Sequence, residues 1–221
     1  MQKKSNILIE ALAVLAIALG TTLILVNTKS ASLKPYVDLI ISAIWLYLPV
    51  ILLLAKRVSF ADLALDKINL VSSLKWLLIA SLAVFPVFYL ACWLGAIKIM
   101  GWKFNLEIPE NFWKLALAQL LLAALPEELF FRGYLQARFN QILGKNWKFL
   151  SAQIGPGLFI TAALFALAHF AITPAPDRLL VFFPALLFGW LREKTNSLLA
   201  PTLFHFASNI TFIIFQVSIV R

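Results

Sequence analysis

The chain has 221 residues, of which 62% are hydrophobic and only 13% are charged, and its mean hydropathy is +0.91. Soluble globular proteins carry about 25% charged residues, so this composition excludes that class and predicts an integral membrane protein. The formal net charge of +9 would suggest nucleic acid as the partner of a soluble protein. Here the basic residues lie between apolar runs, where they face anionic headgroups, so we expect a lipid bilayer as partner and no nucleic acid.

Seven apolar runs follow one another along the chain, judged against the roughly 20 helical residues that cross about 30 Å of hydrocarbon. They predict an all-α fold in one integral membrane domain over residues 1–221: a polytopic transmembrane helix bundle with seven membrane helices, or eight as the alternative. The sixth run has only thirteen residues, which suits a tilted, re-entrant or core-buried helix. The runs are Ile7–Val26, Tyr36–Ala55, Trp76–Leu94, Phe112–Phe131 or beyond, Gln153–Ile172, Leu179–Leu191 and Leu198–Val220.

The basic residues also predict an orientation. With the N-terminus inside, twelve of the 19 Lys and Arg residues, Arg132 among them, fall on inner segments and seven on outer segments. Positive residues accumulate on the cytoplasmic side, so we expect a cytoplasmic N-terminus. Between the second and third runs, Val58–Leu70 mixes apolar residues with Asp62, Asp66 and Lys67, a pattern typical of a helix that lies in the membrane interface.

The fourth run contains two adjacent carboxylates and a guanidinium, at Glu127, Glu128 and Arg132. An ionisable group at membrane depth costs at least about 2.5–3.5 kcal/mol, so such a group indicates a functional site. Glu128 and Arg132 are four residues apart on one helix face and can form an ion pair. Glu127 is turned about 100° away and has no partner close in sequence. The alternative is a Glu-Arg ion pair that only holds two helices together.

Both histidines of the chain also lie in apolar runs, His169 in the fifth and His205 in the seventh. The spacing of four places His205 and Asn209 on one helix face. At 1.5 Å per helical residue, Glu127, His169 and His205 can all lie near the middle of the membrane after modest tilting. We therefore expect these side chains to meet at one point in the bundle.

Such a set of side chains suits amide hydrolysis. Glu127 with His169 can activate a water molecule, and His205 with Asn209 can donate hydrogen bonds to the oxyanion that develops. Two other classes stay open: a non-catalytic membrane scaffold or bacteriocin-immunity-type protein, and a proton-coupled carrier. The lack of paired, Gly- or Pro-broken segments in two matching halves counts against a carrier built from inverted repeats.

The same residues raise the question of zinc. Glu127, His169 and His205 could supply three ligands to Zn²⁺, with a water molecule in the fourth position. No His-Glu-x-x-His pair lies on a single helix. We also find no evident acid to orient the histidines as ligands, because Glu128 is better used by Arg132. We therefore expect no cofactor and keep zinc as the alternative.

Three motifs, taken in sequence order, resemble those of a family of intramembrane proteases. This family includes the type II CaaX prenyl endopeptidase and its bacterial, Abi-type and bacteriocin-processing relatives. They are Glu127-Glu128 with Arg132, Phe165 with His169, and His205 with Asn209. The resemblance covers a protease core of about residues 112–220.

The resemblance implies an intramembrane endopeptidase that cuts a membrane-anchored protein or peptide, in a bacterial cytoplasmic (inner) membrane. It implies Glu127 and His169 as the water-activating pair, His205 and Asn209 as oxyanion stabilisers, and Glu128 and Arg132 as supporting residues. The family has been described both as metal-dependent and as glutamate-type. Whether the substrate is prenylated, and the oligomeric state, stay open.

Overall fold

The structure, a computed structural model, describes residues 2–57 and 68–220. Residues 58–67, which make up most of the predicted interfacial helix Val58–Leu70, lie outside the described residues. Within the described residues the chain forms seven helical rods. They are α1 (Gln2–Val26), α2 (Val37–Ala55) preceded by the 3-10 turn η1 (Lys34–Tyr36), α3 (Leu70–Trp93) extended by the π-helical η3 (Leu94–Ile99), a long central rod, α7 (Pro156–Ile172), α8 (Phe182–Thr195) preceded by the 3-10 segment η6 (Pro176–Val181), and α9 (Leu199–Ser218).

The central rod is continuous from Phe112 to Leu143 and carries the predicted Glu pair. It consists of α4 (Phe112–Ala118), the π-helical η4 (Gln119–Ala124), α5 (Leu125–Glu128), the π-helical η5 (Leu129–Gln136) and α6 (Ala137–Leu143). The rod ends at Gly144, whose φ of 80° is a conformation that glycine adopts without strain. Wide π-helical turns are rare and occur frequently at functional sites, and here they flank the Glu pair on both sides.

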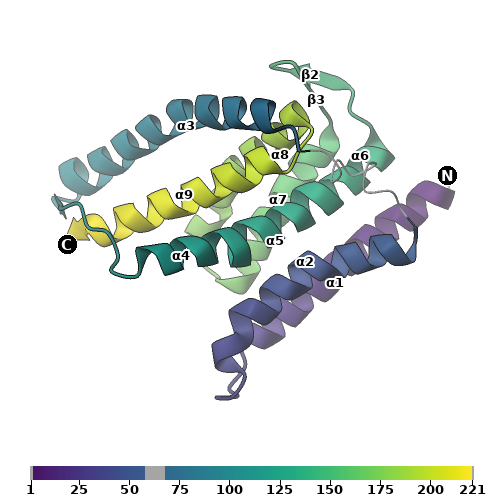
Figure 1. Cartoon of the computed structure of the whole chain (residues 1–221), viewed down its shortest axis with the longest axis horizontal. Helices are drawn as coiled ribbons and strands as arrows, with labels where there is room; N and C mark the ends of the chain where they lie inside the picture. Colours follow the sequence, from purple (N-terminus) through teal and green to yellow (C-terminus); the bar gives the residue numbers. More distant parts are fainter. Residues whose placement is uncertain (1, 58–67, 221) are drawn as a thin grey trace.

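The rods pack as a bundle around the central one (Figure 1). Helices α3 and α9 lie together on one side of the central rod, and α1 and α2 lie together on the other, with α7 and α8 behind. Trp45 of α2 stacks on Phe131 of the rod at 5.3 Å between ring centroids, and its indole Nε1 donates to Thr22 of α1. These contacts fix the α1–α2 pair against the segment that carries the two carboxylates.

In the described part of the chain, four helical spans are long and apolar enough to cross a membrane. They are Lys4–Val26, Lys34–Ala55, Leu70–Ile99 and Leu199–Ser218, and Pro156–Ile172 is a shorter apolar helix. The predicted all-α membrane bundle is confirmed. The number of crossings, seven or eight, and the orientation stay predictions.

Two short antiparallel pairs of strands shift the predicted limits of two runs. The fifth helix begins at Pro156 rather than Gln153, because β3 (Ala152–Ile154) pairs with β2 (Trp147–Phe149) through a turn in which Leu150 and Ser151 have positive φ. Tight turns between antiparallel strands use residues with positive φ, because the twist of such a turn matches the twist of the strands. The seventh helix ends at Ser218, where β4 (Ile219–Val220) pairs with β1 (Lys103–Phe104).

A polar network around Glu193 joins the end of α8 to the end of the central rod. The side chain of Glu193, at the end of α8, is 1% exposed and accepts bonds at 2.7–2.9 Å from four donors. The donors are Gln136, Asn140, Lys145 and Arg192. Burial alone would raise the pKa of Glu193, but the charges of Arg192 and Lys145 and the hydrogen bonds hold it below its ordinary value.

We expect Glu193→Gln to lower the thermal unfolding temperature at pH 7, and the difference from wild type to close in acid. A carboxyl group with a lowered folded-state pKa stabilises the fold above its unfolded pKa of about 4.3. This stabilisation is lost as the pH falls through the folded-state value. Unfolding in detergent from pH 7 to pH 3 measures the effect, with the exposed Glu110→Gln as control. A gap that is constant with pH would contradict it.

Candidate active site

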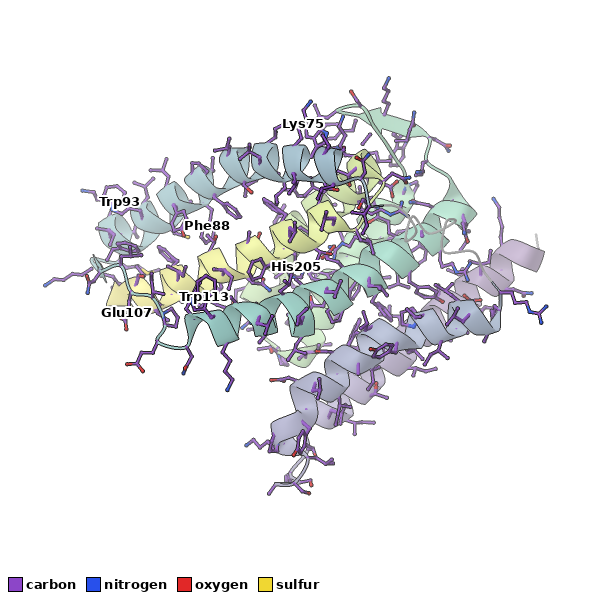
Figure 2. All side chains as sticks on the ribbon, in the orientation of Figure 1. Lys75, Phe88, Trp93, Glu107, Trp113 and His205 are labelled. Carbon is purple, nitrogen blue, oxygen red and sulfur yellow. The ribbon has the colours of Figure 1, made fainter. Side chains whose placement is uncertain are left out.

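Three helices bring Glu127, His169 and His205 to one point. The Glu127 Oε2 atom of α5 lies 3.9 Å from Nε2 of His169 on α7 and 3.8 Å from Nε2 of His205 on α9. His205 lies on the part of α9 that runs beside the central rod (Figure 2). The side chains of Glu127 and His169 are each 27% exposed, whereas that of His205 is 6% exposed. The structure thus brings together the three side chains that the sequence predicts to meet, and their catalytic roles stay predictions.

Glu128 and Arg132 form the predicted ion pair inside the bundle. Arg132 Nη1 lies 2.9 Å from Glu128 Oε1, and both side chains are 0–1% exposed. The second guanidinium nitrogen, Nη2, donates to the carbonyl oxygen of Ala185 on α8 at 3.1 Å. The guanidinium carbon also lies 4.5 Å from the ring centroid of Phe165 and 5.0 Å from that of Phe188. The charge of Arg132 is thus compensated inside the bundle.

Glu128 has a second partner. This partner removes one of the two reasons for expecting no zinc, namely that no acid is available to orient a histidine. Its Oε1 atom also lies 2.8 Å from Nδ1 of His205. One carboxylate oxygen can accept more than one hydrogen bond, so Glu128 serves Arg132 and His205 together. An acid that orients a histidine is therefore present, contrary to the expectation that Arg132 would use Glu128 alone.

The partners of the two Nδ1 atoms determine the histidine tautomers. His169 Nδ1 lies 2.9 Å from the carbonyl oxygen of Phe165, which can only accept, so the proton is on Nδ1. The same reasoning places a proton on Nδ1 of His205, because it faces the Glu128 carboxylate. In the neutral form, both Nε2 atoms therefore present lone pairs towards Glu127 Oε2, a buried oxygen with no hydrogen-bond partner among the described residues. Three acceptors face one another, so the centre needs a proton-donating molecule or an added proton.

Two phenylalanine rings hold the histidines in place. His169 packs on Phe165 of its own helix at 4.3 Å between ring centroids, and His205 stacks on Phe188 at 4.7 Å and 17°. Both phenylalanines are 2% exposed. Phe188 lies on α8 between the two histidine motifs, and sequence reasoning missed it because an aromatic residue in an apolar run carries no local signal.

Asn209 binds a residue that sequence reasoning also missed. Its Nδ2 atom donates to Oε1 of Gln119, at the start of the π-helical η4, at 2.9 Å. One amide proton of Asn209 is thus used, and a second is left for another acceptor. An isolated amide inside an apolar run is the same signal that singled out the histidines, and it could have found Gln119.

A cavity of about 80 Å³ opens beside Glu127 and His169. Its polar side chains are Glu127, His169 and Ser42, and the rest of its wall is apolar. Three wall residues come from α2, which lies outside the predicted protease core of residues 112–220. The lining residues are Ile41, Ser42, Trp45, Leu122, Pro126, Glu127, Phe131, Ala168, His169 and Ile172.

Comparison with known proteins agrees with the motifs. Residues 109–211 match the family model described as type II CAAX prenyl endopeptidase, Rce1-like. The matched segment contains every predicted site residue and leaves out α1, α2 and α3. A comparison with curated proteins and another with solved structures found no match. Residues 109–211 are thus similar to the Rce1-like type II CAAX prenyl endopeptidase family, as the motifs predict.

Proposed function

We propose that this protein is an intramembrane endopeptidase that hydrolyses a peptide bond of a membrane-tethered protein or peptide. The observation that carries the proposal is the position of Glu127 Oε2 between the two Nε2 atoms, at 3.8 and 3.9 Å, beside an apolar cavity. The match of residues 109–211 to the model of a peptidase family supports it. A protein that only packs its helices has no need of an unpaired carboxylate oxygen beside such a cavity.

Glu127 and His169 activate the attacking water in this proposal. A water molecule about 2.8 Å from each of two acceptors can bridge atoms that are 3.9 Å apart. Such a water donates one proton to Glu127 Oε2 and the other to the Nε2 lone pair of His169. One of these groups takes a proton as the water oxygen attacks the carbonyl carbon, and the proton later passes to the leaving amine.

His205 and Asn209 stabilise the oxyanion of the tetrahedral intermediate. Nδ1 of His205 is committed to Glu128, so His205 donates from Nε2 only when both nitrogens carry protons. Asn209 contributes the amide proton that Gln119 does not use. Donors placed in advance at a developing negative charge usually provide the largest single contribution to catalysis.

The α2 side of the bundle is the side of substrate entry in this proposal. The cavity wall formed by α2 and α7 is apolar, with Ile41, Trp45 and Ile172 around Ser42, Glu127 and His169. An apolar wall next to the reacting groups suits a peptide that arrives from the lipid. The substrate class is therefore a membrane-anchored chain, prenylated or not.

Comparison of the protein termini in cell membranes tests the function without a chosen substrate. Cells that produce the wild type should contain new termini that are absent with Glu127→Gln, and prenylated or unprenylated sequences beside them identify the substrate class. Glu110→Gln, an exposed loop variant, should match the wild type. Identical termini at equal protein abundance would contradict the peptidase and favour the scaffold or the carrier.

The proposed reaction uses no metal ion. Neighbouring ligands of tetrahedral Zn²⁺ at 2.0–2.1 Å lie about 3.4 Å apart, closer than the 3.8 and 3.9 Å separations at Glu127. Residues 2–57 and 68–220 contain no group of three His, Cys, Asp or Glu side chains that could hold a metal ion. These separations favour a bridging water, although the tautomers of His169 and His205 would leave both Nε2 atoms free to bind a metal.

We expect a strong chelator to leave the cleavage rate unchanged and added Zn²⁺ not to increase it. A metal with three protein ligands would be held tightly, and its removal would abolish activity. Elemental analysis of the purified protein accompanies the rate measurement, with a zinc-dependent protease treated in parallel. Stoichiometric zinc that leaves together with the activity, and restores it on return, would contradict metal-free hydrolysis.

A further inference from the structure

Pro126 leaves the central rod with a carbonyl group that lacks its usual donor. In the π-helical η4 the N–H of a residue donates to the carbonyl five residues before it, as Leu125 does to Leu120, and Pro126, the next residue, has no N–H to donate. The proline follows the π-helical η4 and directly precedes Glu127. In an apolar environment an unsatisfied carbonyl costs several kcal/mol, so membrane helices with an internal proline need another group to satisfy it.

A carbonyl in the turn before Pro126, that of Leu122, has a donor on a different helix, the hydroxyl group of Ser42. Ser42 Oγ of α2 lies 2.5 Å from the Leu122 carbonyl oxygen, across 80 residues of sequence. It also lies 2.7 Å from the carbonyl of Asp38 in its own helix. Two carbonyl acceptors share one hydroxyl proton, and the shorter contact is to Leu122. The Ser42 residue is 5% exposed, so no bulk water competes for these acceptors.

This contact lies next to the proposed catalytic pair. Ser42, Leu122, Pro126, Glu127 and His169 all line the same cavity. The direction of the rod at Pro126 sets the place of the Glu127 carboxylate, because the two residues are consecutive. A shift of the rod there changes the separation between Glu127 Oε2 and His169 Nε2, which is 3.9 Å in this structure.

We propose that Ser42 is a positioning residue: its hydroxyl binds the Leu122 carbonyl, in the turn that Pro126 interrupts, and so holds Glu127 in register with His169. The inference rests on the proposed peptidase activity for its effect on rate. It assigns a role in the reaction to α2, which lies outside the segment that matches the family model.

The isosteric pair Ser42→Thr and Ser42→Val tests the hydroxyl, because the two variants differ only in that group. We expect Ser42→Val to lower kcat about tenfold with KM little changed, since a buried carbonyl then loses its donor close to Glu127. Ser42→Thr should keep kcat within about twofold of wild type. Thr21→Val is the matched control, because the Thr21 hydroxyl contacts only carbonyls of its own helix.

Pro126→Ala provides the second arm, because it returns a backbone N–H to the turn that contains the Leu122 carbonyl. In the Pro126→Ala chain, the effect of Ser42→Val on kcat and on the thermal unfolding temperature should largely disappear. Equal kcat for the Thr and Val variants would overturn the positioning role. An undiminished effect of Ser42→Val in the Pro126→Ala chain would overturn the link to the proline.

The unfolding measurements separate this inference from the proposed function. A wild type that cleaves no membrane protein or reporter would contradict the peptidase. The unfolding temperatures of Ser42→Val, Pro126→Ala and the double variant would then still test the hydrogen bond between Ser42 and Leu122. A smaller effect of Ser42→Val in the Pro126→Ala chain would support the bond, and an equal effect would overturn its link to the proline. Strong coupling in unfolding together with an unaffected kcat would show that Ser42 stabilises the bundle only, against the positioning role.

Discussion

Replacing Arg132 with alanine is expected to lower the free energy of unfolding by about 3–5 kcal/mol. Arg132 and Glu128 are buried at 0% exposure and lie 2.9 Å apart. Removal of the guanidinium leaves the Glu128 carboxylate in the centre of the bundle with its contact to His205 but without its arginine partner, and takes one donor from the Ala185 carbonyl. The expected loss is therefore that of a buried carboxylate without its cationic partner rather than that of one hydrogen bond.

Further variants in detergent unfolding separate this effect from a general loss of packing. Glu128→Gln should destabilise to a similar extent, and the double variant Glu128→Gln/Arg132→Ala should recover part of the loss. Lys56→Ala is the matched control: it breaks an ion pair with Glu10 in which the lysine side chain is 49% exposed. Pairs of that kind contribute about 1 kcal/mol or less. Additive losses in the double variant would contradict the coupling of Glu128 with Arg132.

The second large effect is expected at Glu127 and concerns rate rather than stability. Glu127→Gln keeps the size of the side chain but removes a carboxylate that can take a proton, and general base catalysis contributes about 10²–10⁴-fold. Glu127 Oε2 has no hydrogen-bond partner among the described residues, so its neutralisation should leave the unfolding temperature nearly unchanged. We thus expect replacement of Glu128 to lower mainly the free energy of unfolding, and replacement of the adjacent Glu127 to lower mainly kcat.

Much of the fold could be predicted from the sequence because membrane helices satisfy their own backbone and show as long apolar runs. Each predicted run lies mainly on a helix, and the fourth continues beyond Phe131 to Leu143. The β2–β3 pair was missed because its residues, such as Trp147 and Phe149, pair through a short turn with no apolar run of their own. The start of the fifth helix shifted for the same reason.

The site was predicted where its residues stand out chemically, and missed where they do not. An ionisable residue in an apolar run is visible in the sequence, and so are partners four residues apart, such as Glu128 and Arg132. The bond from His205 to Glu128 spans 77 residues, and that from Ser42 to Leu122 spans 80. Contacts across such separations depend on how the helices pack, so no local pattern predicts them.

The contribution of α2 is the largest addition that the structure makes to the site. The motifs and the family match place the protease core after α3. Ser42 and Trp45 nevertheless form one wall of the cavity beside Glu127. A chain that lacked α1 and α2 would expose the Leu122 carbonyl and open this wall, so the first two helices belong to the proposed active site.

The central claim is that Glu127 is the base of a peptide-bond hydrolysis inside the membrane. The most direct test of this claim measures the rate at which purified wild type, Glu127→Gln and the exposed control Glu110→Gln cleave a membrane-tethered peptide reporter. Thermal unfolding first shows that the three proteins are equally folded. We predict that the wild type and Glu110→Gln cleave at the same rate and that Glu127→Gln is slower by at least about 10²-fold. Equal rates for all three folded proteins would contradict the claim.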